Sequence, residues 1–399
     1  VVAPLGVRGL AGTPLAHLLR LVAPELRGGA VYAAPGWCPF AERLDHLDGP
    51  AFPQEATHPD TPALLTFTTG STGRPKAMAR THGLLEAQRA ALARHMCVTH
   101  LDVSLETLPV FALSSLAAGA KVVLADCDLR RPGSVDPARV VAQMRAQKVT
   151  VATASPAFFA PIARWLLTRG ETYRGMRALW TGGARVPAAL LRELCAAFPA
   201  ANVEVVYGSS EAEPIAGVDA RDHLDEIDAG EADGEGALVG TPVPDTHVRV
   251  VKPGTFEETD GIGEIVVAGD HVNPSYFRDP EADAATKVHA EGRVWHRTGD
   301  TGRRDARGRL WLVGRVADVV HGLHPYPIEA AAERIPGVRR AALIDRAGAP
   351  LLCVEGEDGV VERVRATVKH VDVSAVSHIP VDRRHNAKVD RAALRALVG

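Results

Sequence analysis

The sequence predicts an α/β protein with a large N-terminal domain of parallel sheets covered by helices, a small β-rich subdomain, and a small α+β lobe at the C-terminal end. Three observations predict this fold class. Strand-like and helix-like runs alternate between residues 62 and 207, turn-rich β segments follow residue 236, and a separate mixed unit closes the chain. We therefore predict domains at 1–314 and 315–399, with the β-rich subdomain at about 236–314.

The alternating region begins with an apolar, β-branched run at 63–67, which predicts a strand. A loop of Thr, Ser and Gly follows, and then a helix over 82–95. Farther along, Asp136 and Pro137 supply an N-cap acceptor and a first-turn proline for a helix that ends at Gln147. The remaining elements are strands at 121–125, 149–152, 178–180 and 203–207, and helices at 156–168 and 187–198. Because helices separate these strands, we expect neighbouring strands to be parallel.

The character of the sequence changes in its last third. Strands at 246–252 and 263–267 are joined by turns rich in Pro, Gly and Asp, which predicts a smaller, mostly antiparallel barrel or sheet. The final unit starts near Val316. It contains predicted helices at 328–334 and 360–370 and predicted strands at 340–344 and 351–354.

The composition is that of a soluble globular protein, with 46% hydrophobic and 23% charged residues. A formal net charge of −3 gives no reason to expect a nucleic-acid partner. The five cysteines are scattered and form no CxxC pair, which argues against a disulfide framework and a structural zinc site. No apolar run has the length of a membrane span, and we read no targeting signal. We expect a cytoplasmic protein.

The loop after the first strand is predicted to bind an anion. Its residues are Thr68, Thr69, Gly70, Ser71, Thr72 and Gly73, followed by Arg74, Pro75 and Lys76. Glycines let backbone N–H groups turn inward, hydroxyls add donors, and the lysine adds positive charge, so a polyphosphate would fit. A Walker A loop is excluded, because counting from Gly70 the second glycine position is Pro75 and the hydroxyl position is Ala77. A flexible Ser/Gly turn is the alternative.

The run TFTTGSTGRPK at 66–76 resembles the signature loop of the adenylate-forming superfamily of acyl-CoA synthetases, luciferases and peptide-synthetase adenylation domains. Further motifs that resemble this superfamily follow in the same order along the chain. They are Trp180-Thr-Gly-Gly-Ala184, Tyr207-Gly-Ser-Ser-Glu211, Arg297-Thr-Gly-Asp300, Gly314-Arg315 and Asn386-Ala-Lys388. The resemblance covers nearly the whole chain and implies that ATP is the polyphosphate.

The resemblance implies an adenine site at Gly182, Gly183 and Ala184, where a flat purine would lie against the backbone. Tyr207 would stack on the other face of the purine. A close-packed strand-to-helix turn is the competing interpretation of the two glycines. Asp300 would accept hydrogen bonds from the ribose hydroxyls.

The resemblance also implies the groups that act on the phosphates. Ser210, with Gly208 beside it, would donate to the α-phosphate, and Glu211 would bind Mg²⁺, which prefers oxygen ligands. A solvated loop carboxylate is the alternative for Glu211. Arg315 would contact phosphate or ribose, and Lys388 would stabilise the charge on the pentavalent α-phosphorus.

The C-terminal lobe is implied to be mobile, rotating about a hinge near 315–318 to build a second site. The hinge position that is usually acidic or Lys in the superfamily is Ala317 here, with Asp318 after it. The pivot is therefore left open.

Within the superfamily, the chain most resembles the β-lactone synthetases of bacterial olefin biosynthesis. The segments that carry this resemblance are 108–113, 126–132, 207–214 and 378–388. It implies that a 3-hydroxy acid is adenylated and that its hydroxyl then expels AMP to close a β-lactone. Phe111 and Ala112 are candidates to line the acyl pocket, with core packing as the alternative. His82 could orient substrate or phosphate, or cap its helix.

Two alternative functions stay open. A ligase of the same chemistry would pass the acyl group to coenzyme A or to a carrier-protein thiol. A protein of another class, an inactive nucleotide-binding sensor or scaffold, is disfavoured by the presence of Lys76, Glu211, Asp300, Arg315 and Lys388. Only 67 residues precede the phosphate loop, fewer than the superfamily usually has, so the N-terminal region is either naturally short or incomplete.

Overall fold

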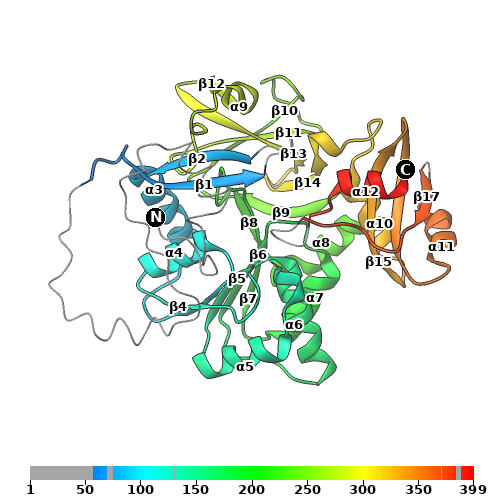
Figure 1. Ribbon diagram of the computed structural model, residues 1–399, viewed down its shortest axis with the longest axis horizontal. Helices are drawn as coiled ribbons and strands as arrows, with labels where there is room; N and C mark the ends of the chain where they lie inside the picture. Colours follow the sequence, from blue (N-terminus) through cyan, green and yellow to red (C-terminus); the bar gives the residue numbers. More distant parts are fainter. Residues whose placement is uncertain (1–56, 70–74, 130, 370, 383–387) are drawn as a thin grey trace, which may run out of the picture.

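The computed structural model describes residues 57–69, 75–129, 131–369, 371–382 and 388–399 (Figure 1). Part of the predicted phosphate loop, from Gly70 through Ser71, Thr72 and Gly73 to Arg74, lies outside the described residues. Asn386 and Ala387 of the C-terminal lysine motif also lie outside them.

A sheet of twelve strands runs through the described part of the protein, and its second half is parallel. The parallel strands are β7 (Asn202–Tyr207), β6 (Ala178–Gly182), β5 (Val151–Ala154), β3 (Val103–Glu106) and β4 (Lys121–Leu124), in this order across the sheet. The helices that connect them are α4 (Pro109–Ala117), α5 (Pro137–Gln147), α6 (Pro156–Thr168) and α7 (Ala188–Ala197). The α/β fold class is confirmed.

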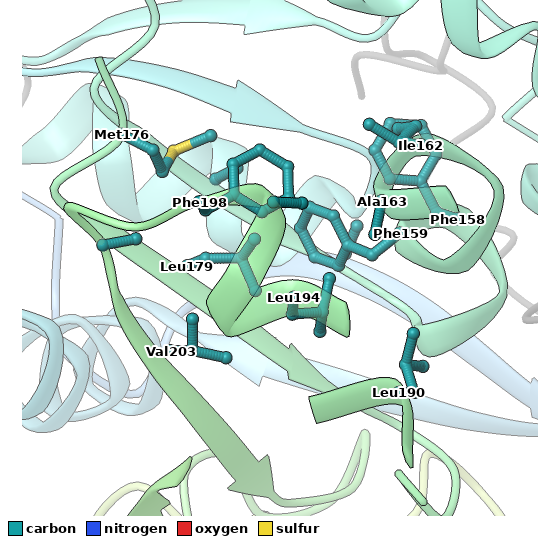
Figure 2. Packing of buried hydrophobic residues seen from close by; sticks show 14 of the residues in the cluster. Phe158, Phe159, Ile162, Ala163, Met176, Leu179, Leu190, Leu194, Phe198 and Val203 are labelled. Carbon is teal, nitrogen blue, oxygen red and sulfur yellow. The ribbon is translucent and has the colours of Figure 1, made fainter. Parts of the chain in front are cut away.

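The largest apolar core lies where α6 and α7 pack on this parallel half (Figure 2). Phe158, Phe159 and Ile162 from α6 interdigitate with Leu194 from α7 and with Phe198, which follows it. These side chains are almost completely excluded from solvent, so their burial contributes to the hydrophobic stabilisation of the domain.

The other half of the sheet is antiparallel, and it begins at β8, which pairs with β7. It consists of β8 (Ala216–Asp219), β9 (Ala237–Pro242), β14 (Leu310–Arg315), β13 (Arg293–Arg304), β11 (Gly263–Ala268) and β10 (His247–Val251), with β12 (Lys287–Ala290) on β13. Helix α8 (Ala220–Ala232) follows β8, and α9 (Pro280–Thr286) precedes β12. The expectation of antiparallel strands here is confirmed. The expectation that they form a smaller sheet of their own is wrong, because they belong to the same twelve-stranded sheet. Pairing of β8 with both β7 and β9 joins the two halves.

The strand predicted before the phosphate loop forms a hairpin rather than part of the parallel sheet. Strand β1 (Pro62–Thr69) pairs antiparallel with β2 (Pro75–Thr81), with Thr68 opposite Lys76. Helix α3 (His82–Met96) follows directly. Strand β2 was not predicted, because its sequence lacks an alternating apolar pattern and it depends on β1 for its hydrogen bonds.

The last part of the chain is a three-stranded sheet with helices packed against it. Its elements are the 3₁₀ helix η4 (Val316–Asp318), α10 (Pro325–Glu333), β15 (Val338–Arg346), β16 (Ala349–Gly356), α11 (Val360–Thr367), β17 (Asp372–Ala375) and α12 (Arg391–Val398). Figure 1 shows this lobe at one side of the molecule, with α10 next to α8. The boundary at 314/315 stays a prediction.

Among the described residues we find no helix with the length and apolar character needed to cross a bilayer.

Candidate active site

The carboxyl ends of β6 and β7 lie side by side and bring two of the predicted motifs together. Gly182 at the end of β6 is paired with Val206, one residue before Tyr207. A Cβ atom at Gly182 would lie 2.1 Å from the Val206 carbonyl oxygen, so glycine is required there by strand packing. This supports the close-packing interpretation of Gly182. Gly183 has a φ of +81°, and with Ala184 it turns the chain away from the strand.

Asp300 is held from two sides. The Tyr207 hydroxyl donates to Asp300 Oδ2 at 2.9 Å, and Arg315 Nε lies 3.3 Å from Oδ1. Asp300 and Arg315 are opposite each other in the β13–β14 pair, so the sheet register itself brings them together. The structure thus unites three predicted site residues from β7, β13 and β14. Stacking of Tyr207 on adenine stays a prediction, whereas its hydroxyl has a defined partner.

Lys388 comes from the C-terminal lobe and reaches this group. An isolated bridge between Val381 and Val389 and a 2.9 Å hydrogen bond from the Lys388 amide to Asp382 Oδ1 fix its backbone. Taken as a whole residue, Lys388 is exposed to solvent. Burial lowers the pKa of Lys388, and the charge of Asp300 opposes this effect.

The positive charge of Lys388 also acts on Arg315 and on Glu211, so it lies within electrostatic reach of both. Three groups predicted from well-separated motifs therefore share one region with Asp300.

Glu211 lies just beyond the end of β7 and is hydrogen-bonded by a neighbouring segment. The Tyr276 hydroxyl donates to Glu211 Oε1 at 2.8 Å, and the Asn273 amide donates to the Glu211 carbonyl at 2.7 Å. Glu211 is therefore a packed side chain and not a solvated loop carboxylate.

In the described part of the chain, no group of three or more His, Cys, Asp or Glu side chains is arranged to hold a metal ion. A single protein carboxylate fits Mg²⁺ that is bound mainly by phosphate oxygens and water, which is the usual arrangement in nucleotide sites. Glu211 is the carboxylate that would serve.

The remaining phosphate residues lie around the hairpin of β1 and β2. Lys76 follows the undescribed part of the loop, and its ammonium is 5.1 Å from the centre of the Tyr276 ring. Ser210 is tied to β2, because the buried guanidinium of Arg80 donates to its carbonyl. Arg80 also donates to Gln88 of α3 at 2.9 Å. This links the Ser210 segment to the hairpin and to the helix behind it.

Four residues near the site were not predicted from the sequence: Arg80, Glu213, Tyr276 and Lys287. The Glu213 carboxylate packs against Gly208, where a Cβ would lie 2.4 Å from Glu213 Oε2. Its Oε1 is buried without a hydrogen-bond partner among the described residues, and burial raises the pKa of Glu213 to about 8. The signal available in the sequence was an acidic residue five positions after Gly208, which is weak on its own.

The acyl-pocket candidates lie on α4. Phe111 is 6% exposed and packs with Leu92, Trp180 and their neighbours, which supports core packing. It also borders a small cavity between α3 and α4, so its role toward an acyl chain stays a prediction. Ala112, the next residue, is half-buried.

His82 is exposed at the first position of α3. The hydroxyl of Thr81 accepts from the Leu84 amide at 3.1 Å and caps the helix. The expectation that His82 is the cap is therefore wrong, because the preceding residue occupies the N-cap position. Its contact with substrate stays a prediction.

Comparison with known proteins identifies the family of this chain. The model of the AMP-binding enzyme family matches residues 19–277. An olefin beta-lactone synthetase of Stenotrophomonas maltophilia is 33% identical to this protein, over 96% of this chain and 76% of its own. That of Xanthomonas campestris pv. campestris is 32% identical, over 85% of this chain and 67% of its own.

Among solved structures, O-succinylbenzoate coenzyme A synthetase from Bacillus subtilis, in complex with ATP and magnesium ion, has the same fold. It superimposes with a TM-score of 0.69 at 23% identity, covering 92% of this chain and 75% of its own. The amide bond synthetase McbA from Marinactinospora thermotolerans gives a TM-score of 0.72 at 24% identity, covering 90% and 78%. With the family match, these findings show that the chain belongs to the AMP-binding enzyme family.

Proposed function

We propose that this protein uses ATP to convert a 3-hydroxy carboxylic acid into an acyl-adenylate and then closes the adenylate to a β-lactone. Pyrophosphate and AMP are the other products. The observation that carries the proposal is the group of Tyr207, Asp300 and Arg315, which the structure brings together from three separate predicted motifs. The 33% identity with an olefin beta-lactone synthetase over 96% of this chain supports the lactone-forming step.

In the first step, an oxygen of the substrate carboxylate attacks the α-phosphorus, and the bond to the pyrophosphate oxygen breaks. Negative charge grows on the phosphate oxygens, and Lys388 and Arg315 provide fixed positive charge near them. Ser210 donates to the α-phosphate, and Lys76 holds the outer phosphates. When bound at Glu211, Mg²⁺ would neutralise part of the triphosphate charge.

The nucleoside is held by residues already paired with one another. Asp300 accepts from the ribose hydroxyls, and its orientation is set by Tyr207 and Arg315. Gly183 and Ala184 present backbone to the adenine, next to the packed strand end at Gly182. Prior pairing reduces the entropy lost on binding.

In the second step, the 3-hydroxyl oxygen bonds to the acyl carbon, and the bond between that carbon and the phosphate oxygen breaks. AMP leaves, and the hydroxyl proton passes to the departing phosphate or to solvent. Nucleophile and acyl carbon belong to one molecule, so this step is unimolecular and has a proximity advantage over attack by an external thiol. Phe111 and Ala112 remain our candidates for the acyl side of the pocket.

A panel of carboxylic acids tests the proposal. The protein is incubated with ATP, Mg²⁺ and 3-hydroxy acids of different chain length, with and without coenzyme A, and the products are followed by mass spectrometry and infrared absorption of the lactone carbonyl. We expect AMP, pyrophosphate and a lactone without any thiol.

Matched 3-deoxy acids are the control. They retain the carboxylate but lack the internal nucleophile, so they should support pyrophosphate exchange without lactone formation. A product that forms only when thiol is added would instead identify an acyl-CoA or carrier-protein ligase. Failure of every acid to release pyrophosphate would favour a nucleotide-binding scaffold.

A further inference from the structure

One segment of the protein spans the distance between the two predicted phosphate-site residues Glu211 and Lys76. At its start, Val272 bridges to Ala212, and the Asn273 amide donates to the Glu211 carbonyl at 2.7 Å. At its end, the Phe277 amide donates to the Ala77 carbonyl of β2 at 2.7 Å. The backbone of 272–277 therefore fixes the position of the Glu211 turn relative to the strand that carries Lys76.

The side chain of Tyr276 lies between those of Glu211 and Lys76 and contacts both. It is 5% exposed, and its hydroxyl donates to Glu211 Oε1 at 2.8 Å. Two ammonium groups contact its ring, with Lys76 Nζ at 5.1 Å and Lys287 Nζ at 5.2 Å from the centroid. Both distances allow cation–π attraction, which strengthens when the cation is desolvated.

Lys287 is the unusual member of this group, because it is a lysine with only 7% exposure. Its Nζ donates to the Asn273 carbonyl and lies 3.2 Å from His296 Nδ1. Among the described residues it forms no ion pair with a carboxylate. A buried ammonium is expensive unless polar groups compensate it, and here the Asn273 carbonyl, the His296 ring nitrogen and the Tyr276 ring do so.

We propose that Tyr276 and Lys287 are positioning residues for nucleotide activation: Tyr276 orients the Glu211 carboxylate for a divalent cation bound to the triphosphate, and Lys287 holds the Tyr276 ring in place. This inference rests on the proposed function, since it takes Glu211 as the metal-binding carboxylate. A hydrogen bond from a neutral hydroxyl leaves the negative charge on Glu211, whereas an ion pair with a lysine would compete with the metal. Here the Tyr276 hydroxyl contacts the Glu211 carboxylate, and the Lys287 ammonium contacts the Tyr276 ring.

The decisive variant is Tyr276→Phe, which removes the hydroxyl and keeps the ring and both cation contacts. We expect the Mg²⁺ concentration for half-maximal pyrophosphate release to rise about tenfold, the effect of losing one hydrogen bond to a charged group. The kcat at saturating Mg²⁺ should stay within about twofold. Binding of Mn²⁺ in the presence of ATP, followed by electron paramagnetic resonance without any acid, should weaken by the same factor.

Tyr173→Phe is the matched control. The Tyr173 hydroxyl is also buried, and it donates to the Val149 carbonyl at 2.7 Å within the core beneath α5. Its loss should lower the melting temperature and leave the dependence on Mg²⁺ unchanged. This control separates a purely structural effect of removing a buried hydroxyl from an effect on the metal.

Lys287→Met tests the second half of the inference. On its own it should also weaken Mn²⁺ binding, because the ring is held less firmly. In the Tyr276→Phe background it should change metal dependence by less than about twofold, since Lys287 is inferred to act through the hydroxyl that is already missing.

The outcomes are separable. If Tyr276→Phe leaves the Mg²⁺ and Mn²⁺ dependence as in the wild type while Glu211→Gln weakens it, the positioning role is wrong. Additive effects of Tyr276→Phe and Lys287→Met would overturn the coupling between them. If Glu211→Gln itself leaves metal dependence unchanged, the assignment of Glu211 within the proposed function fails.

Discussion

At the scale of single residues, the charged side chains around Asp300 set the electrostatics of the site. Lys388 is the one that comes from the lobe, and it shares this region with Arg315 and Glu211. Asp300 is already bonded to Tyr207 and paired with Arg315, so Lys388 is not needed to hold it. We infer that Lys388 acts on the reacting phosphate rather than on the resting structure.

We predict that Lys388→Ala lowers the rate of acyl-adenylate formation by about 10²- to 10³-fold, the scale of losing one transition-state donor. ATP affinity should change little. The rate is measured by pyrophosphate release and the affinity by calorimetry. Lys369→Ala, at an exposed lysine of the same lobe, is the control and should change neither. A collapse of ATP affinity in Lys388→Ala would instead assign the lysine to ground-state binding.

Glu106, which is not one of the predicted phosphate-site residues, makes the stability of the protein depend on pH. It is 1% exposed, its Oε1 accepts from the hydroxyls of Ser104 at 2.6 Å and Ser115 at 3.0 Å, and its Oε2 has no partner among the described residues. Burial raises the pKa of Glu106 from 4.5 to about 8. Between these two pH values the folded protein binds the proton and the unfolded chain releases it, so stability falls as the pH rises.

We predict that Glu106→Gln abolishes this fall. Each pKa unit corresponds to about 1.4 kcal/mol, so at pH 8 the variant should be more stable than the wild type by on the order of 2–4 kcal/mol, with little difference at pH 5. Urea unfolding at several pH values measures this. Glu86→Gln, at an exposed ion pair with Arg89, is the control. Parallel stability curves for Glu106→Gln and the wild type would contradict the prediction.

At the scale of elements, the site depends on how closely β6 and β7 end together. The carbonyl of Val206 occupies the space that a side chain at Gly182 would need. The two strand ends cannot separate locally, because β5 pairs with β6 on one side and β8 with β7 on the other. The adenine candidates Gly183 and Ala184 begin at this point, so strand packing sets their position.

We predict that Gly182→Ala costs about 1–3 kcal/mol of stability, as overpacking does, and also weakens ATP binding because the strand ends must shift. Gly261→Ala is the matched control, since a Cβ there meets an ordinary contact at 3.6 Å. Denaturant unfolding and nucleotide calorimetry provide the two readouts. Unchanged ATP affinity in a folded Gly182→Ala variant would mean that adenine does not contact this turn.

At the scale of the whole molecule, a cluster of ion pairs connects the C-terminal lobe to the N-terminal part. Arg185, in the loop after β6, is 10% exposed and pairs with Glu231 of α8 and with Glu333 of α10. Glu231 also accepts from the Ala188 amide at the start of α7. Since Lys388 belongs to the lobe, this cluster contributes to the placement of Lys388.

We predict that Arg185→Ala loosens the lobe, because the Glu231 and Glu333 carboxylates lose the cation that they share, a loss of about 3–5 kcal/mol at most. Cleavage by a protease near 316–318 should become faster and hydrogen exchange in α10 should increase, while α6 keeps its protection. Arg139→Ala, at a more exposed pair with Asp126 outside the lobe, is the control. Equal protection of α10 in Arg185→Ala and the wild type would show that the cluster does not hold the lobe.

The sequence predicted the elements whose signals are local. Helix α6 has the predicted bounds, 156–168, and α5 starts after the predicted cap, with Asp136 Oδ1 accepting from the Ala138 amide at 3.0 Å. The site motifs and their order along the chain could also be recognised in the sequence, because each motif is a run of adjacent residues. In contrast, β2 was missed, since its partner strand and not its own pattern makes it a strand.

The sequence by itself determined the α/β class, the membership of the AMP-binding enzyme family and the motifs that carry Asp300, Glu211 and Lys388. These depend on short-range signals: periodicity, caps and contiguous residue types. Only the tertiary structure decided that Tyr207 bonds to Asp300, that Arg80 holds the Ser210 segment, and that Tyr276 joins Glu211 to Lys76. The physical reason is that hydrogen bonds and buried charges are satisfied across long sequence separations, where no pattern in the neighbouring residues identifies the partner.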